Sequence, residues 1–247
     1  MNSDFFLAKP PHKKICQDYI AIRDDEISLS DGCGGARETD VGARIVACAD
    51  WDSLASCQYR EMVEWLRLPP ESLYCTSLRL KVVDQGKAIS FRRIGDGYLI
   101  EGHEDYIRCT RYYYAVNAPF YIGYDIYNEV ERYLDIPNNG LTTEITEFDK
   151  NFVFKNKLTT YTEEPENLLA AHTLIPTKGL DWIAVTSDGL DSFSTPIEDV
   201  LKAFFLFKNF NGCFVQRRAQ VAMREFESEG VSFHDDLSIG VINLASI

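Results

Sequence analysis

Asp31-Gly32-Cys33-Gly34-Gly35 is one of two stretches that decide how this chain folds, and the other is Thr186-Ser187-Asp188-Gly189-Leu190-Asp191. Each stretch places an acidic residue and a glycine directly after a run with strand character. Residues 27–30 alternate apolar and polar side chains, and residues 182–185 are apolar nearly throughout. Both stretches are therefore predicted to present a carboxylate at the end of a β-strand.

A third acidic pair, Asp235-Asp236, lies directly before another predicted strand at residues 237–244. Carboxylates brought together from the ends of several strands suit hard divalent cations, because Mg²⁺ and Mn²⁺ prefer oxygen ligands. We interpret the three acidic segments as parts of one metal site.

An Asp-Gly pair can also mark a tight turn, and such pairs begin at Asp31, Asp96 and Asp188. A hairpin turn must be followed by a second strand, and only Asp96-Gly97 is, at residues 98–100. We therefore expect a hairpin there and a different role for the other two pairs. Asp191 is interpreted as a cap of the following helix, in preference to a support for Asp188.

The composition is that of a folded protein. The 247 residues are 45% hydrophobic and 13% aromatic, which excludes a disordered chain. Because no repeat, low-complexity tract or Gly/Ser linker is present, residues 1–247 are expected to form a single domain, and a monomer. No apolar run approaches the roughly 18 residues of a membrane span, and the first residues lack a secretory segment. A soluble, cytoplasmic protein without a membrane partner is therefore expected.

Cysteine usage and net charge indicate which kinds of protein this chain is not. The seven cysteines form no CxxC pair and have no zinc-type spacing, which indicates reduced thiols rather than a disulfide framework. The net charge of -13 argues against a nucleic-acid partner, because phosphate backbones require basic surfaces.

Hydrophobic periodicity predicts an α+β fold with two antiparallel sheets packed face to face and helices outside. Residues 78–101 are expected to form a meander, and Gly230 is expected to end the last helix. The expected strands are 18–23, 26–30, 78–83, 88–94, 98–101, 106–114, 141–148, 152–161, 182–186 and 237–244, and the expected helices are 38–66, 197–207 and 215–228.

The ordered motifs resemble those of the metal-dependent Ser/Thr protein phosphatases of type 2C, the PPM family, and especially its compact bacterial members. Any one motif is a weak signal, whereas the ordered set, which spans residues 13–242, is specific. The resemblance implies a four-layer αββα sandwich. It is carried by Gln17-Asp18, Asp31-Gly32-Cys33-Gly34-Gly35, Gly95-Asp96, Ser187-Asp188-Gly189 and Asp235-Asp236-Leu237-Ser238.

The resemblance also implies a role for each matching residue. Asp31 matches the aspartate that bridges two metal ions, and Gly32 matches the glycine that adds its backbone carbonyl. Asp188 and Asp235 match further metal ligands. Two more matches complete the set: Asp18 corresponds to an aspartate that holds metal-bound water in the outer shell, and Asp96 to one that helps bind a third, weaker ion.

The implied cofactor is a pair of Mn²⁺ or Mg²⁺ ions. In this chemistry a water or hydroxide that bridges two metals attacks phosphorus directly, and the metals offset the developing charge. The product serine or threonine leaves without a phosphoenzyme, so no cysteine nucleophile motif is needed.

The chain departs from the family pattern at two positions. The family's phosphate-binding arginine is matched by Lys13, which can neutralise phosphate but cannot form a bidentate fork. Cys33 takes the position at which animal members have a histidine proposed to protonate the leaving oxygen.

The residues support three functions from different classes. The first is a phosphatase acting on phosphoserine or phosphothreonine in a protein, with a partner Ser/Thr kinase. The second is a catalytically weak pseudophosphatase that binds a phosphoprotein or regulatory partner, which the departures at Lys13 and Cys33 leave open. The third, a structural cation-binding domain, ranks last because it leaves the glycine-rich turn after Asp31 unexplained.

Overall fold

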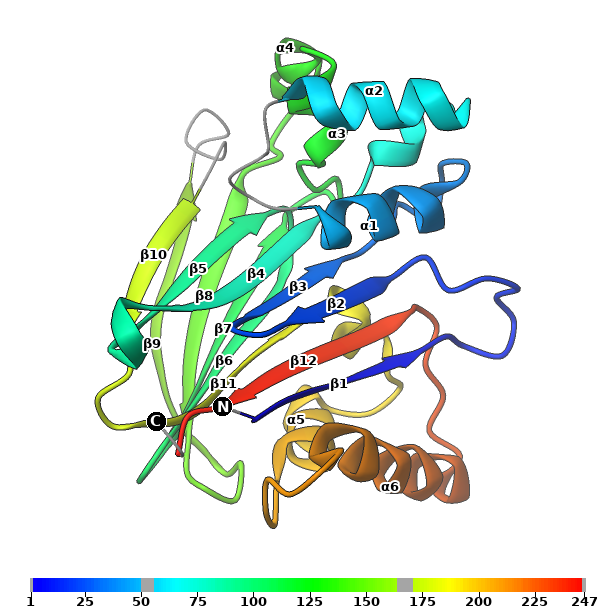
Figure 1. Ribbon diagram of the computed structural model, residues 1–247. Helices are drawn as coiled ribbons and strands as arrows, with labels where there is room; N and C mark the ends of the chain where they lie inside the picture. The colour runs from blue at the N-terminus through cyan, green and yellow to red at the C-terminus, as the bar shows by residue number, and fades with distance from the viewer. Residues whose placement is uncertain (1, 50–55, 164–170, 246–247) are drawn as a thin grey trace.

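Two antiparallel β-sheets pack face to face in the computed structural model, which describes residues 2–49, 56–163 and 171–245 (Figure 1). Helices cover the outer faces, so the architecture is the expected α+β four-layer αββα sandwich. The seven-stranded sheet has the order β1 (Asn2–Ala8), β12 (Leu237–Asn243), β11 (Leu180–Thr186), β6 (Gly97–His103), β7 (Ile107–Tyr114), β8 (Leu141–Phe148) and β9 (Phe154–Glu163). The five-stranded sheet has the order β10 (Ala171–Pro176), β5 (Ala88–Ile94), β4 (Ser77–Val83), β3 (Glu26–Ser30) and β2 (Tyr19–Arg23).

Different helices cover the two sheets. On the five-stranded sheet α1 packs over β2 and β3, and on the seven-stranded sheet α6 packs over β1 and β12 beside α5. The α-helices are α1 (Thr39–Cys48), α2 (Ser56–Leu66), α3 (Ile122–Ile126), α4 (Val130–Leu134), α5 (Ile197–Phe205) and α6 (Phe214–Glu229). Short 3₁₀ turns are η2 (Pro70–Leu73), η3 (Asp84–Gly86) and η5 (Asp188–Ser192). No described helix is long and apolar enough to cross a membrane.

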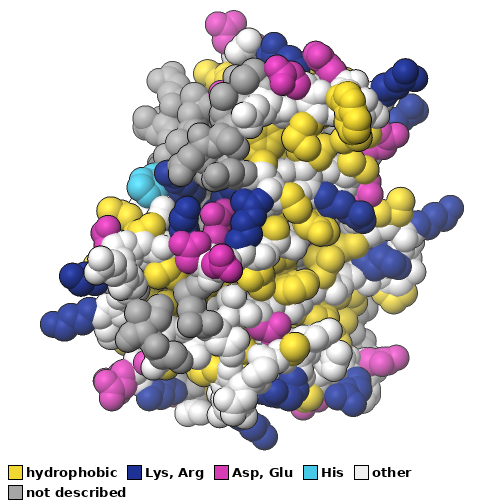
Figure 2. Space-filling view, viewed as in Figure 1, with side chains coloured by type: hydrophobic (Ala, Val, Ile, Leu, Met, Phe, Trp, Pro, Cys, Tyr) yellow, Lys and Arg dark blue, Asp and Glu magenta, His cyan; other side chains and the backbone are white. Residues whose placement is uncertain are grey.

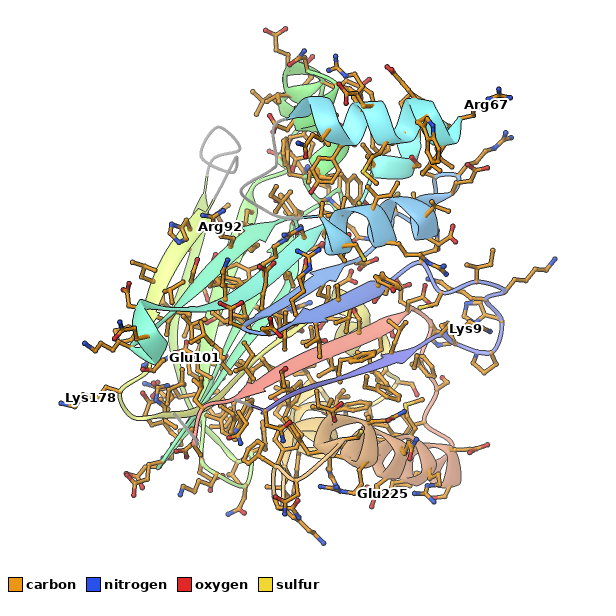
Figure 3. All side chains as sticks on the ribbon, viewed as in Figure 1. Lys9, Arg67, Arg92, Glu101, Lys178 and Glu225 are labelled. Carbon is orange, nitrogen blue, oxygen red and sulfur yellow. The ribbon has the colours of Figure 1, made fainter. Side chains whose placement is uncertain are left out.

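The position of strand β11 explains why its side chains are apolar on both faces. Ile183 and Val185 belong to the core between the sheets, whereas Trp182 and Ala184 belong to the core under α5 and α6. All four are buried, because alternate side chains of a central strand enter different layers. Side chains fill both interlayer spaces in Figure 3. An apolar run in this chain therefore marks a strand covered on both sides.

The strand pairing gathers several strand ends at one edge of the sandwich. Thr186 at the end of β11 pairs with Ile239 near the start of β12 and with Tyr98 near the start of β6. In the other sheet Ser77, at the start of β4, pairs with Ile94 at the end of β5. Because neighbouring strands are antiparallel, the end of one strand lies beside the start of the next.

Most predicted elements are confirmed, including the strands at 26–30, 88–94 and 141–148 and the last helix with Gly230 in its left-handed cap position. The meander over 78–101 is wrong, because β5 and β6 lie in different sheets. Asp96-Gly97 is therefore a crossing between sheets and not a hairpin turn. The strands β1 and β10 were not predicted.

The single helix predicted over 38–66 is also wrong. Helix α1 ends at Cys48, α2 begins at Ser56, and part of the intervening stretch, 50–55, lies outside the described residues. The end of α1 is capped from another strand, because buried Arg79 of β4 donates from Nη1 to the Ala49 carbonyl at 2.8 Å and from Nη2 to the Val46 carbonyl. A cation at the carbonyl end of a helix satisfies groups that the helix itself leaves unpaired.

Helix α6 is likewise capped from a distant strand. Its N-cap residue, Cys213, makes no side-chain cap, and instead Asp4 of β1 accepts hydrogen bonds from the backbone N–H of Val215 at 2.6 Å and of Gln216 at 3.2 Å. Asp4 is buried, so its carboxylate adds charge complementary to the positive end of the helix dipole.

Replacing Asp4 tests this cap. Asp4→Ala should lower the free energy of unfolding by about 1–2 kcal/mol, because two N–H groups lose their acceptor. Asp4→Asn, which keeps an acceptor, should lose less. Urea unfolding followed by circular dichroism measures both variants, with exposed Asp105→Ala as the control. An Asp4→Ala protein as stable as the control would show that the cap contributes nothing.

Candidate metal centre

The acidic segments meet in one pocket at the edge of the sandwich where the strand ends gather. The pocket has a volume of about 300 Å³. Its lining residues are Asp31, Gly32, Cys33, Gly34, Gly35, Thr76, Asp96, Asn117, Pro119, Tyr121, Asp188 and Asp235. The structure thus brings together every residue predicted as a metal ligand.

Asp31 is positioned by hydrogen bonds to Thr76, the residue directly before β4. Its backbone N–H donates to Oγ1 of Thr76 at 3.2 Å, and its carbonyl accepts from the Thr76 N–H at 2.8 Å. The hydroxyl of Ser30 donates to the Thr76 carbonyl at 2.7 Å. Gly32 then forms an isolated bridge with Cys75. These bonds hold the Asp31-Gly32 backbone rigidly at the end of β3, as a ligand set requires.

Asp188 is positioned by hydrogen bonds between the preceding residue, Ser187, and Ser238 at the start of β12. The N–H of Ser187 donates to the Ser238 carbonyl at 3.1 Å, and the Ser187 hydroxyl accepts from the Ser238 N–H at 3.1 Å. A Cβ on Gly189 would lie 1.9 Å from the Asp236 carbonyl oxygen. Only glycine fits at this approach, so the Asp-Gly pair here is a packing requirement and not a turn signal.

Asp96 reaches the pocket because the chain changes sheets at this point. Gly97 has a φ of +123°, and a Cβ there would lie 2.6 Å from the Thr186 carbonyl oxygen. The conformation and the close approach both require glycine. Asp96 is buried between the end of β5 and the start of β6. The crossing that replaces the expected hairpin therefore delivers a carboxylate to the site.

Asp18 lies outside the pocket lining and is buried. Neither of its carboxylate oxygens has a hydrogen-bond partner among the described residues. Burial raises the pKa of Asp18 to about 7. Its charge also contributes to the raised pKa of Asp31, so the two carboxyls are close electrostatic neighbours. This placement agrees with a residue behind the ligands.

The other carboxyls share this unfavourable environment. Burial raises the pKa of Asp31, Asp96 and Asp188, and the charge of Asp188 adds to the effect on the other two. Carboxylates held this close repel one another unless protons or cations intervene. A divalent cation relieves the repulsion and keeps the groups ionised.

The residues fit a hard divalent cation. Oδ1 of Asp188, Oδ1 of Asp236 and both oxygens of Asp18 are buried without a hydrogen-bond partner in the described part of the chain. The donor set is oxygen throughout, apart from the Cys33 thiol. Over residues 2–49, 56–163 and 171–245, no three acidic, histidine or cysteine side chains already converge on one point. Binding would thus require side-chain rearrangement.

One side chain that would have to move is Asp235, because it is paired with Lys13. The Lys13 ammonium donates to Oδ1 of Asp235 and, at 3.1 Å, to Oδ2 of Asp236. Burial alone would lower the pKa of Lys13, but the hydrogen bonds and charges of the two aspartates raise it. The side chain of Asp235 is 52% exposed, whereas that of Asp236 is 1% exposed. Asp235 therefore has room to turn from Lys13 toward a cation.

Asp236 is a site residue to which the sequence assigned no role. Its Oδ2 accepts from the backbone N–H of Gln17 at 2.8 Å as well as from Lys13. The side chain of Gln17 in turn donates to the Cys33 carbonyl at 3.2 Å and to Thr39 Oγ1 at 2.8 Å. Asp236 thus fastens the segment before β2 to the start of β12.

Asp191 does not cap the following helix. Helix α5 begins at Ile197 without a side-chain cap, and the Asp191 carboxylate instead accepts from the Tyr98 hydroxyl and pairs with Arg111 at 2.8 Å. The cap prediction is wrong because the partners come from β6 and β7. The lining residues Asn117, Pro119 and Tyr121 were also missed, because the loop after β7 that carries them reaches the site only through the tertiary fold.

The carboxyl environment predicts how stability depends on pH. In metal-free buffer the free energy of unfolding should fall as pH rises from about 4 to about 7. Asp18 has a pKa of about 7 in the folded protein and about 4 in the unfolded chain, so unfolding releases its proton over that range. Asp18→Asn should reduce the fall. Urea unfolding with EDTA measures it, with Asp105→Asn as the control, and equal slopes for all three proteins would contradict the assignment.

Solved structures of bacterial phosphatases align over nearly the whole chain. A bacterial serine phosphatase aligns with a TM-score of 0.57 at 13% identity, over 99% of this chain and 98% of its own. The serine/threonine phosphatase Stp1 from Staphylococcus aureus aligns with a TM-score of 0.56 at 13% identity, over 98% of this chain and 95% of its own. No protein-family model and no curated protein matches the sequence.

The low identity limits this likeness to the fold, and at that level it agrees with the ordered motifs. The two antiparallel sheets expected from hydrophobic periodicity and the four-layer sandwich implied by the resemblance to the type 2C phosphatases are both confirmed. The chain has the fold of the bacterial serine/threonine phosphatases.

Proposed function

We propose that this protein is a Mn²⁺- or Mg²⁺-dependent phosphatase that removes phosphate from phosphoserine or phosphothreonine in proteins. One observation carries the proposal: Asp31, Asp96, Asp188 and Asp235, from separate strand ends, line one pocket in a fold shared with serine/threonine phosphatases. The raised pKa values of the first three indicate that the pocket needs positive charge.

In this proposal the chain's carboxylates hold the cations. Asp31, the backbone carbonyl of Gly32, Asp188 and Asp235 would hold two ions. Asp96 with Asp188 would hold a third, weaker ion, and Asp18 would act from behind Asp31. When bound, the cations supply a nucleophile from water near neutral pH and offset the charge on the phosphate.

Residues in the pocket and beside it contact the substrate in this scheme. Lys13 exchanges its pairing with Asp235 for a phosphate oxygen as Asp235 turns toward a cation. Burial raises the pKa of Tyr121, so its phenol keeps its proton and can donate to a substrate oxygen. Cys33 lies in the same pocket, at the position of the animal family members' histidine.

The substrate is a phosphorylated protein, and a Ser/Thr kinase that adds the phosphate is the implied partner. The protein acts as a single catalytic domain and as a monomer in this proposal. The net charge of -13 disfavours nucleic acid as an alternative partner.

A pseudophosphatase is the second candidate, and the pairing of Lys13 with Asp235 favours it. An ammonium on a ligand carboxylate competes with the cation, and lysine lacks the fork that binds phosphate at two points. Such a protein would bind a phosphoprotein or regulatory partner with little or no turnover.

Turnover of p-nitrophenyl phosphate and of a phosphothreonine peptide separates the candidates. Asp31→Asn and Asp188→Asn should each reduce Mn²⁺-dependent turnover by more than about 100-fold, because even outer partners of metal ligands cost 10–100-fold. EDTA should abolish the activity, and Asp105→Asn should leave it unchanged. Near-normal turnover in either site variant, with circular dichroism showing a folded protein, would remove the site assignment. No turnover in the wild type, with Mn²⁺ binding measurable by calorimetry, would favour the pseudophosphatase.

Lys13→Arg tests the phosphate contact. The guanidinium can bind phosphate at two points, so the KM for the phosphopeptide should fall by about threefold to tenfold, with kcat less affected. Lys14→Arg is the matched control, because Lys14 is the neighbouring lysine and is exposed, whereas the ion pairs with Asp235 and Asp236 are formed by Lys13. An unchanged KM in Lys13→Arg would remove the role of Lys13 in phosphate binding.

A further inference from the structure

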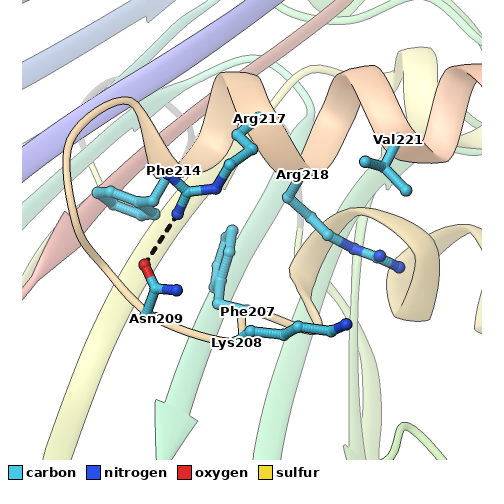
Figure 4. A pocket seen from close by; sticks show the side chains of 7 residues that line it. All are labelled: Phe207, Lys208, Asn209, Phe214, Arg217, Arg218 and Val221. Atoms are coloured by element: carbon cyan, nitrogen blue, oxygen red, sulfur yellow. Dashed lines mark hydrogen bonds between the residues drawn. The ribbon is translucent and has the colours of Figure 1, made fainter.

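A second pocket lies in the helical layer that covers the seven-stranded sheet, where α5 leads into α6 (Figure 4). Its volume is about 190 Å³, below the 300–1,000 Å³ typical of small-molecule sites and large enough for an apolar side chain. It is lined by Phe207, Lys208, Asn209, Phe214, Arg217, Arg218 and Val221. None of these residues belongs to the metal centre.

The floor of the pocket is aromatic. Phe207 and Phe214 pack edge to face with ring centroids 5.4 Å apart, and Phe210 lies 5.3 Å and 5.1 Å from them. Phe214 is buried, whereas Phe207 is partly exposed at the centre of the pocket. A partly exposed ring that is already packed against two other rings offers contact area with little further loss of side-chain freedom.

The rim is cationic. Lys208, Arg217 and Arg218 line the pocket, and among the described residues none of the three forms an ion pair with a carboxylate. Along the lower edge of the molecule, where Figure 1 places α6, Figure 2 shows Lys and Arg side chains interspersed with Asp and Glu. Three uncompensated cations around an apolar pocket contrast with the overall net charge of -13.

The two arginines are held in place by neutral groups. Arg217 donates to Oδ1 of Asn209 at 2.9 Å and to the Asn211 carbonyl at 3.0 Å, and Arg218 donates to the Lys202 carbonyl at 3.3 Å. These bonds orient the guanidinium groups without neutralising them. Oriented cations that keep their charge favour a carboxylate ligand.

Phe207 also lines a third pocket, of about 410 Å³, whose walls include Trp182, Phe205 and Phe210. Two pockets that share one aromatic wall suit an extended chain with more than one apolar side chain better than a compact molecule. The positive charge on the rim favours chains with acidic side chains.

We infer that the pocket at Phe207 is a docking site for an acidic segment of a partner protein, in which a large apolar side chain enters the pocket and flanking carboxylates contact Lys208, Arg217 and Arg218. The site is independent of the metal centre and of the proposed phosphatase activity. It would supply partner recognition that the small metal pocket does not.

A displayed library of random 12-residue peptides tests the inference, selected on the wild type and depleted on Val221→Trp, which fills the pocket. The selected peptides should share an aromatic or large aliphatic residue with at least two acidic neighbours. No enrichment, or a shared pattern without acidic residues, would overturn the inference.

Variants then locate the binding of a selected, fluorescein-labelled peptide, measured by anisotropy. Lys208→Glu combined with Arg218→Glu should weaken binding by about tenfold or more, because two attractions become repulsions. Arg224→Glu is the matched control, since Arg224 is an exposed cation of α6 outside the pocket. Circular dichroism checks that each variant folds, and equal losses in the double variant and the control would contradict a located site.

Two further measurements distinguish the docking site from a membrane-binding surface and from an extension of the metal centre. Binding of phosphatidylglycerol vesicles that the same double variant abolishes would reassign the surface to a membrane. The Asp188→Asn protein should bind the peptide as tightly as the wild type, whether or not the wild type is an active phosphatase. Loss of peptide binding in Asp188→Asn would contradict the independence of the two sites.

Discussion

Antiparallel pairing on both sides of β11 is the constraint on which the site depends. Because β6 and β12 both run opposite to β11, the acidic residues after β11, before β12 and before β6 must meet at one edge. A register shift of one residue would turn Ile183 and Val185 out of the core between the sheets, so the core opposes such a shift. Hydrophobic burial thus determines the positions of the carboxylates, although the carboxylates themselves add nothing to the hydrophobic stabilisation.

Much of this arrangement could be predicted from local patterns. The apolar run at β11 and the alternation at β3 each placed an aspartate at a strand end, and the order of the motifs indicated the two-sheet fold. These predictions were correct because each depends only on residues that are neighbours along the chain. The same patterns could not tell that Gly97 serves a crossing, since a hairpin and a change of sheet both place a glycine between two strands.

The remaining features depend on partners far away in the sequence. Asp191 faces Tyr98 and Arg111, Asp4 caps a helix from the opposite end of the chain, and Lys13 pairs with Asp235. Local patterns constrain such partners only loosely, because a carboxylate can accept from any donor that the fold brings near. Glu225, by contrast, points to solvent from α6, where its exposed position follows from the helical pattern alone (Figure 3).

The crossing at Gly97 has a mechanical consequence. Asp31 stands at the end of a strand of the five-stranded sheet, Asp188 follows a strand of the seven-stranded sheet, and Asp96 sits on a short link between the two sheets at this edge. Sliding one sheet along the other would change all three separations together. An ion shared by Asp31 and Asp188 would therefore link the two sheets, and its loss would allow them to slide relative to each other at this edge.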